Sequence, residues 1–141
     1  MNDKVFLDTN ILIYSVDKRF PDKQNQAMRI IAFLQANHRA VISTQVLQEF
    51  YNATTKKLKL DKHQMQILVD KFAKLPVLNN DVKLLKNAIH ISIIHHLTLW
   101  DAYMVAGAKR ADCTILYTED LTHNQIIEGV KIINPFYLEN D

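Results

Sequence analysis

The chain has 141 residues, enough for one domain that buries roughly two thirds of the surface of its unfolded chain. Hydrophobic residues make up 48% of it and charged residues 23%, which is ordinary for a soluble globular protein, and a net charge of +2 is too small to indicate a polyanionic partner by itself. No segment approaches the roughly 20 apolar residues of a membrane span, and Cys113 is the only cysteine, which excludes an intrachain disulfide and gives no sign of a zinc cluster.

The predicted secondary structure alternates between strands and helices. Short runs of β-branched and aromatic residues predict strands, and apolar residues at helical spacing predict helices with one buried face. Pro21 opens one helix, Ser43-Thr44 supplies the N-cap of another, and Thr98 opens a third through a Thr-x-x-Asp capping box. In chain order we predict a strand at 5–7, helices at 11–14 and from 21, a strand at 40–42, helices from 44 and at 61–74, a strand at 77–78, helices at 81–96 and from 98, and strands at 114–117 and 130–133.

This alternation is typical of parallel β-α-β units, so the predicted class is α/β with helices on both faces of a central sheet. Crossovers between the strands are expected to be right-handed. The chain has only two glycines and three prolines, too few for the many tight turns of a sandwich or barrel. No internal repeat or linker-like stretch divides it, and we expect a single domain over residues 1–141.

Four acidic residues each lie where a predicted strand ends or a predicted helix begins: Asp8, Glu49, Asp101 and Asp120. Asp8 follows the first strand, Asp120 follows the fourth, and Glu49 lies in the helix after the second. In parallel sheets, sites form beyond the carboxyl ends of the strands, so these three residues are predicted to face the same edge. Asp101 lies on the apolar stripe of its own helix, which predicts an inward-pointing carboxylate.

Each acid taken alone has a simpler interpretation. Asp8 could cap the following helix, Glu49 could be a solvated side chain, and Asp101 could serve only in its capping box. The adjacent Glu119 and Asp120 point in different directions, so one of them enters the site, and we predict that it is Asp120. Alternatively, this pair begins a helix at its positive end.

If the four acids converge, a cation is needed to hold them together. An isolated buried charge costs several kcal/mol, and two carboxylates about 5 Å apart repel by roughly 3 kcal/mol at an effective dielectric near 20. Mg²⁺ or Mn²⁺ reverses this sign, because hard oxygen ligands bind such an ion. Asn10 and Thr118 would support the carboxylates through hydrogen bonds. A bound ion of this kind activates water and neutralises charge on a phosphoryl group, so the pattern predicts metal-dependent phosphodiester hydrolysis.

The ordered set of these motifs resembles the PIN domain family, and within that family the VapC-type toxins of bacterial toxin–antitoxin pairs. The resemblance covers about residues 4–137 and is more specific than any single motif. The motifs that carry it are Leu-Asp-Thr-Asn-Ile-Leu at 7–12, Ser43 six residues before Glu49, Trp-Asp-Ala-Tyr at 100–103, Leu-Tyr-Thr-Glu-Asp-Leu at 116–121 and Ile-Asn-Pro-Phe at 133–136.

The resemblance implies a three-layer α/β domain with a central five-stranded parallel sheet flanked by helices. It also implies a Mg²⁺- or Mn²⁺-dependent endoribonuclease with an RNA substrate, usually a homodimer, silenced by a cognate antitoxin protein. Asp8 interrupts the apolar stretch near the N-terminus, unlike a signal peptide, so we expect a cytoplasmic protein. Carried over by position, Asp8 and Asp101 are the main metal ligands, and the acidic and supporting residues together are Asp8, Glu49, Asp101 and Asp120 with Asn10 and Thr118.

Two positions depart from the family pattern, and two further groups of residues have more than one interpretation. Position 119 is Glu, where many relatives have a basic or neutral residue, and position 107 is Gly. Five lysines near the middle helices form either a solvated face or a contact for an RNA backbone. The aromatic residues Phe50, Tyr51, Phe72 and Trp100 are expected in the core or at a dimer surface rather than stacked on bases. The five lysines are Lys56, Lys57, Lys59, Lys62 and Lys71.

Two other functional classes stay open at this point. A catalytically inert PIN-fold interaction module would keep the fold and bind only a partner. An aspartyl phosphotransferase would use Asp8 as its nucleophile, but such enzymes typically have a second Asp two residues later, where this chain has Asn10.

Overall fold

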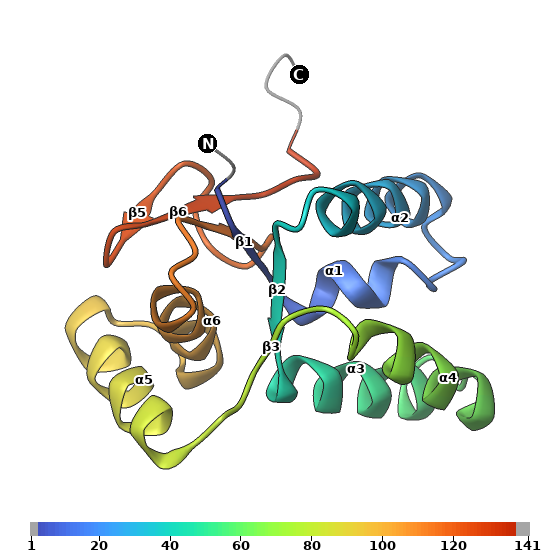
Figure 1. The fold of residues 1–141 in the computed structure, drawn as a ribbon, viewed down its shortest axis with the longest axis horizontal. Helices are drawn as coiled ribbons and strands as arrows, with labels where there is room; N and C mark the ends of the chain where they lie inside the picture. Colours follow the sequence, from blue (N-terminus) through green and yellow to red (C-terminus); the bar gives the residue numbers. More distant parts are fainter. Residues whose placement is uncertain (1–2, 138–141) are drawn as a thin grey trace.

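A computed structural model describes residues 3–137 of the chain. Six strands form one sheet in the order β3-β2-β1-β4-β6-β5, with helices on either side (Figure 1). The strands are β1 Val5–Leu7, β2 Ala40–Ser43, β3 Val77–Leu78, β4 Ile115–Tyr117, β5 Ile126–Ile127 and β6 Val130–Ile133. The helices are α1 Thr9–Tyr14, α2 Pro21–Ala36, α3 Thr44–Lys56, α4 Lys62–Phe72, α5 Val82–His95 and α6 Leu99–Arg110.

The predicted α/β class is confirmed, and the five predicted strands pair in parallel. The sheet has one more strand than expected, because Ile126–Ile127 pairs antiparallel with β6 at the sheet edge. Helices α5 and α6 lie together on one side of the sheet, and α1 to α4 lie on the other (Figure 1). Among the described residues, no helix is long and apolar enough to cross a bilayer.

Strand β1 lies in the middle of the sheet, between β2 and β4. Its three residues are all buried, as expected for a parallel strand with helices over both faces. Leu7 is paired with Tyr117 of β4, so the residues that follow them, Asp8 and Thr118, leave the sheet side by side. This pairing places Asp8 and Thr118 next to each other at the base of the candidate site described below.

Polar side chains cap the helices where the sequence predicts them. Ser43 accepts a hydrogen bond from the backbone nitrogen of Val46 at the start of α3, and Thr98 accepts one from the backbone nitrogen of Asp101 at the start of α6, each at 3.2 Å. Such caps satisfy amide groups that have no partner within the helix, each contributing about 1 kcal/mol. They fix the first turns of α3 and α6, the helices that carry Glu49 and Asp101.

Gly107 lies where α6 packs on β1, and a methyl group there would press against the ring of Phe6. A Cβ atom at this position would stand 3.0 Å from Cζ and 3.1 Å from Cε2 of Phe6, whose side chain is buried. This close approach explains why the chain has glycine inside a helix, where alanine is favoured by about 1 kcal/mol.

We expect Gly107→Ala to destabilise the protein by about 1 kcal/mol, because overpacking costs about 1–3 kcal/mol and exceeds the gain in helix propensity. The melting temperature should fall by about 3 °C, measured by circular dichroism. A double-mutant cycle with Phe6→Leu checks the cause, because the smaller side chain makes room for the methyl group. Additive effects of the two substitutions would contradict the proposed collision.

The carboxylate of Glu128 connects the β5–β6 hairpin to helices α5 and α6. Glu128 and Gly129 form its two-residue turn with φ values of 53° and 79°, a left-handed pair of the type I′ kind. Glu128 Oε1 accepts a hydrogen bond from Lys109 of α6, and Oε2 lies 2.8 Å from Nε2 of His95 of α5. These partners, Lys109 first, lower the pKa of Glu128 to about 2.

We expect Glu128→Gln to cost about 0.5–1 kcal/mol at neutral pH, a modest value because Lys109 is largely exposed. The pKa of Glu128 is lower in the folded state than its ordinary value of 4.5, so its contribution is complete above that value. It is lost progressively as pH falls from that value through about 2, the folded-state pKa, below which the carboxylate is protonated in both states. Urea unfolding at neutral and acidic pH measures the difference; an equal deficit at both would contradict the ion-pair account.

Candidate active site

Asp8 forms the floor of the candidate site at the carboxyl end of β1. Its backbone nitrogen donates to the Tyr117 carbonyl at 3.1 Å, which extends the β1–β4 pairing by one residue. Its Oδ1 accepts from the backbone nitrogen of Thr9 at 2.6 Å, and its Oδ2 accepts from the hydroxyl of Thr118 at 2.7 Å. The side chain is only 6% exposed. Asp8 is therefore both a helix cap and a buried carboxylate directed toward Thr118.

Glu49 reaches the same region from α3, held by two polar side chains that the sequence analysis did not identify. The hydroxyl of Thr9 donates to Glu49 Oε2 at 3.0 Å, and the amide of Gln45 donates to Oε1 at 2.8 Å. Thr9 and Gln45 are both buried. Thr9 therefore connects the two acids, because its backbone binds Asp8 while its hydroxyl binds Glu49. Gln45 precedes Glu49 by one helical turn, a spacing that could have indicated the contact.

Asp101 and Asp120 approach the site from α6 and from the loop after β4. Asp101 is half-buried in the first turn of its helix. Asp120 is exposed; its Oδ2 accepts a hydrogen bond from the amide of Asn10 at 3.3 Å, and its backbone nitrogen donates to the Thr118 hydroxyl at 3.1 Å. Thr118 thus binds both Asp8 and the chain at Asp120. From Asp120 to residue 137, where the described part of the chain ends, there is no helix, so the alternative that Asp120 begins one is wrong.

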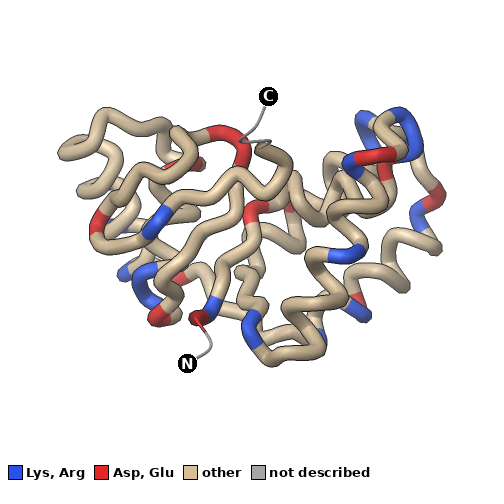
Figure 2. The backbone as a smooth tube through the Cα atoms, turned by 90° about the horizontal axis from the view of Figure 1, so that it is seen from above, with Lys and Arg blue, Asp and Glu red and all other residues tan. Residues whose placement is uncertain are grey.

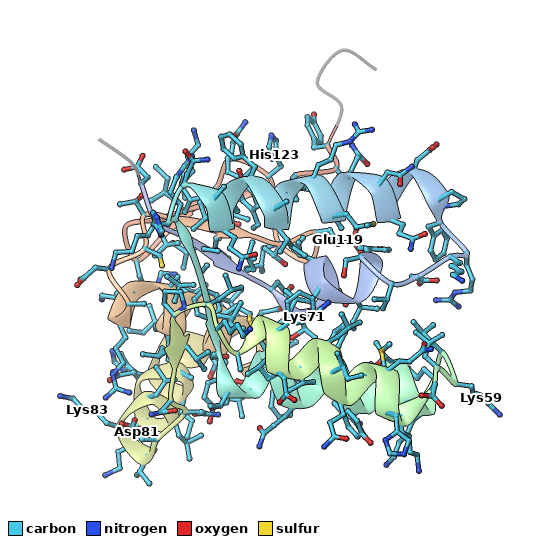
Figure 3. The ribbon with its side chains drawn as sticks, turned by 45° about the vertical axis from the view of Figure 1, so that its right-hand side comes forward. Lys59, Lys71, Asp81, Lys83, Glu119 and His123 are labelled. Atoms are coloured by element: carbon cyan, nitrogen blue, oxygen red, sulfur yellow. The ribbon has the colours of Figure 1, made fainter. Side chains whose placement is uncertain are left out.

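Glu119 points away from the other acids. It lies beside α1 (Figure 3), where it accepts hydrogen bonds from the Tyr14 hydroxyl at 2.5 Å and from Lys23 at 3.1 Å. Lys23 neutralises this carboxylate, so Glu119 is a structural link between α1, α2 and the loop after β4. Of the adjacent pair, only Asp120 lines the cavity with the other three acids.

The structure brings the four predicted acids to one cavity of about 340 Å³. Its walls come from α1, α3, α6 and the loop after β4, and they include polar and basic side chains as well as an aromatic one. The lining residues are Asp8, Thr9, Asn10, Ile13, Glu49, Asn52, Ala53, Lys56, Lys57, Trp100, Asp101, Met104 and Asp120.

Within the described residues, none of the ion pairs includes any of these four acids. Burial raises the pKa of Asp8 to about 7, and the charge on Asp120 adds to the rise, although the hydrogen bonds from Thr118 and Thr9 oppose it. The pKa of Asp101 is also raised, first by burial and then by Asp120, against a hydrogen bond with Thr98. The cavity therefore concentrates negative charge without a basic side chain bound to it.

Asp17 shows how the same chain treats a buried carboxylate whose role is structural. It is 3% exposed, and the Arg19 side chain binds it through Nε at 2.9 Å and Nη2 at 2.8 Å. This guanidinium lowers the pKa of Asp17, the opposite of the shift at Asp8. Asp8 therefore differs from Asp17 in having no basic side chain from the described part of the chain bound to it.

The carboxylate oxygens of the cavity are of the chemical type that binds divalent metal ions. Four carboxylates supply the hard oxygen ligands that Mg²⁺ and Mn²⁺ prefer. Across residues 3–137, however, no three His, Cys, Asp or Glu side chains are already grouped closely enough to hold an ion. Mutual repulsion spreads carboxylates apart when no cation is between them. To bind one ion together, these side chains would have to move closer to one another.

Sequence reasoning treated five lysines alike, but the structure separates them. Lys56 and Lys57 line the acidic cavity, whereas Lys59 does not line it and projects outward at the right-hand edge of Figure 3. Elsewhere, charges of both signs are interspersed along the backbone (Figure 2). Of the aromatic residues expected in the core or at a dimer surface, two lie in the core and one does not. Phe50 packs edge-to-face against Phe72 in the core, but Trp100 is 60% exposed at the cavity.

Comparison with known proteins gives one family match and several similar structures. A family model described as the PIN domain matches residues 5–128, and no curated protein sequence matches the chain. The DNA-bound VapBC of Salmonella typhimurium is similar at a TM-score of 0.68 and 22% identity, covering 94% of this chain and 97% of that one. A toxin–antitoxin complex from Klebsiella pneumoniae gives 0.69 and 21%, covering 96% and 100%. VapC20 of Mycobacterium tuberculosis, a sarcin–ricin loop cleaving toxin, gives 0.62 and 17%, covering 83% and 90%.

Proposed function

Because this chain belongs to the PIN domain family, we propose that it is a Mg²⁺- or Mn²⁺-dependent endoribonuclease that acts as the toxin of a type II toxin–antitoxin pair. The observation that carries the proposal is the cavity in which Asp8, Glu49, Asp101 and Asp120 meet without a basic side chain bound to them. A structural cluster of four acids would instead need its own lysines or arginines, as Asp17 has.

The four acids of the cavity and two polar residues beside them have roles in this proposal. Asp8 and Asp101 are the main ligands of the ion, and Glu49 and Asp120 complete the acidic pocket. Thr118 orients Asp8, and Asn10 orients Asp120, through the hydrogen bonds described above. When bound, the ion supplies an activated water and neutralises charge on the phosphate. The side chains determine where the phosphodiester lies relative to that water.

The similar structures support the toxin assignment. Those from Salmonella typhimurium and Klebsiella pneumoniae are toxin–antitoxin complexes, and VapC20 is a sarcin–ricin loop cleaving toxin. We infer that this chain has an RNA substrate, acts in the cytoplasm as a homodimer, and is silenced by an antitoxin protein.

The aspartyl phosphotransferase alternative has less support. Such enzymes typically have a second Asp two residues after the nucleophile, and this chain has Asn10 there, whose side chain donates a hydrogen bond to Asp120. The inert interaction module is favoured by one observation: the described acids are not already grouped as an ion requires. The two functions differ in whether RNA is cleaved.

Cleavage of RNA by the purified protein tests the proposal directly. We expect total cellular RNA to be cut at discrete positions in Mg²⁺ or Mn²⁺ and to stay intact in excess EDTA. Sequencing the RNA 5′ ends after induced expression then identifies the target. Full activity in EDTA would rule out the metal-dependent mechanism, and intact RNA under all conditions would favour the inert module.

Growth after induced expression tests the toxin assignment separately. We expect expression without an antitoxin to slow growth, and expression of the Asp101→Asn variant to leave growth unchanged. Equal growth of the two cultures, with both proteins accumulating, would contradict a toxin that acts through this site.

A further inference from the structure

Trp100 is the only tryptophan of the chain, and it occupies an unusual place for so large an apolar side chain. It is 60% exposed, lines the acidic cavity and immediately precedes Asp101. Burying an indole stabilises a folded protein strongly. Because Trp100 is exposed, most of this stabilisation is absent. Trp100 therefore lies at the cavity for a reason other than core packing.

The indole is held in a defined orientation. Trp100 belongs to the first turn of α6, where the Thr98 cap holds the backbone. Its ring stacks on that of Tyr103, with the centroids 6.1 Å apart and an angle of 23° between the planes. Tyr103 is buried, so this stack anchors the indole. The arrangement keeps an aromatic surface beside the carboxylate of Asp101.

Lys56 and Lys57 add positive charge to the same cavity. They stand at the C-terminal end of α3, both are exposed, and among the described residues no ion pair includes either one. The cavity thus combines three chemically different features: ligands for a cation, ammonium groups for an anion, and an aromatic platform.

We propose that Trp100 is a nucleobase-stacking subsite of the active site, and that Lys56 and Lys57 bind the phosphate backbone of the same single strand. The identification of the ligand as RNA rests on the proposed function. A cavity that holds a phosphodiester at its carboxylates must also accommodate the flanking bases, and an aromatic face next to Asp101 can stack one of them. A base paired inside a duplex does not expose its face for this contact.

The expected effects follow from the chemistry of each contact. Loss of one stacked base weakens binding of single-stranded nucleic acid about five- to hundred-fold. Loss of one phosphate contact weakens binding regardless of base identity and lowers the salt dependence of log K by about one unit of slope. The two kinds of residue can therefore be told apart in one set of titrations.

The single tryptophan makes the test direct, because the intrinsic fluorescence of the protein at the indole wavelength comes from Trp100 alone. The probe is a short oligoadenylate, titrated in Ca²⁺ in place of Mg²⁺ or Mn²⁺. The comparison probe is an abasic oligomer of equal length, whose sugars carry no bases. We expect the oligoadenylate to quench the emission and the abasic oligomer to leave it unchanged. Equal quenching by both oligomers would overturn the stacking subsite.

Variants of Trp100 and of the two lysines, each compared with a control variant outside the cavity, measure what each residue contributes to binding. We expect Trp100→Ala to weaken binding of labelled oligoadenylate about ten-fold, measured by anisotropy, and Trp100→Phe to retain part of it. Phe33→Ala, which removes an aromatic residue that is exposed outside the cavity, should have no effect. Lys56→Gln and Lys57→Gln should reduce the salt slope, whereas Lys86→Gln on α5 should not. Unchanged binding by Trp100→Ala, or a change in oligomeric state alone, would overturn the proposal and assign Trp100 to a surface between protein copies.

These outcomes separate the subsite from the proposed reaction. Base-dependent quenching without any RNA cleavage in Mg²⁺ would leave the subsite standing and remove the nuclease activity. If Trp100→Ala left both the kcat/KM of RNA cleavage and the base preference unaltered, the nuclease activity would stand and the stacking subsite would be overturned.

Discussion

The Asp101→Asn variant should lose metal-dependent RNA cleavage by at least about a hundred-fold while its fold stays intact. Asp101 contributes a half-buried carboxylate to the cavity, and burial and Asp120 already raise its pKa. An amide has nearly the same shape but offers a cation no negative charge. The backbone hydrogen bond to Thr98, which caps α6, does not depend on the side chain and should survive. Initial rates on a labelled RNA in Mg²⁺ measure the loss.

Asp112→Asn is a matched control for this variant. Asp112 is exposed, does not line the cavity and has a φ of 59°, a left-handed conformation that asparagine adopts readily. The same change of charge is therefore made without touching the site. Both variants should have wild-type circular dichroism spectra. If Asp101→Asn cleaved RNA as fast as Asp112→Asn, the proposed catalytic pocket would be wrong.

Strand order accounts for what could be predicted of the site. Asp8 and Thr118 follow neighbouring parallel strands, and their side chains lie 2.7 Å apart because Leu7 and Tyr117 are paired. The positions of the strand ends predicted that Asp8 and Asp120 lie at the same edge of the sheet, whereas the contact of Asp8 with Thr118 also depends on β1 and β4 being neighbours. The convergence of Asp101 was predicted from the apolar stripe of its helix, which packs against the sheet.

The contacts that depend on tertiary packing could not be predicted in the same way. The bond from Thr9 to Glu49 joins two helices, and no local pattern specifies how close they come. Trp100 was expected in the core or at a dimer surface because most large aromatic residues are buried, and its exposure at the cavity excludes only the core. The strand Ile126–Ile127 was missed because two residues carry too little periodicity to detect.

The acidic cavity has a consequence for stability. In the absence of a cation, Asp8 is held in an environment that disfavours its ionised form, as its pKa of about 7 indicates. Asp17, equally buried, is stabilised by Arg19 instead. The fold therefore keeps unfavourable electrostatics at the cavity, which binding of a cation would relieve.

We accordingly expect Mg²⁺ or Mn²⁺ to raise the melting temperature, because an ion that binds only the folded state stabilises it. At a hundred times its dissociation constant the ion adds about 2.7 kcal/mol, or roughly 5–10 °C for a chain of this size. Differential scanning fluorimetry measures the shift without any RNA. Asp8→Asn and Asp101→Asn should lose most of it, whereas Asp112→Asn should keep it. An equal shift in all of these variants would mean that the ion binds elsewhere, and no shift in the wild type at millimolar Mg²⁺ or Mn²⁺ would mean that the four acids do not form a metal site.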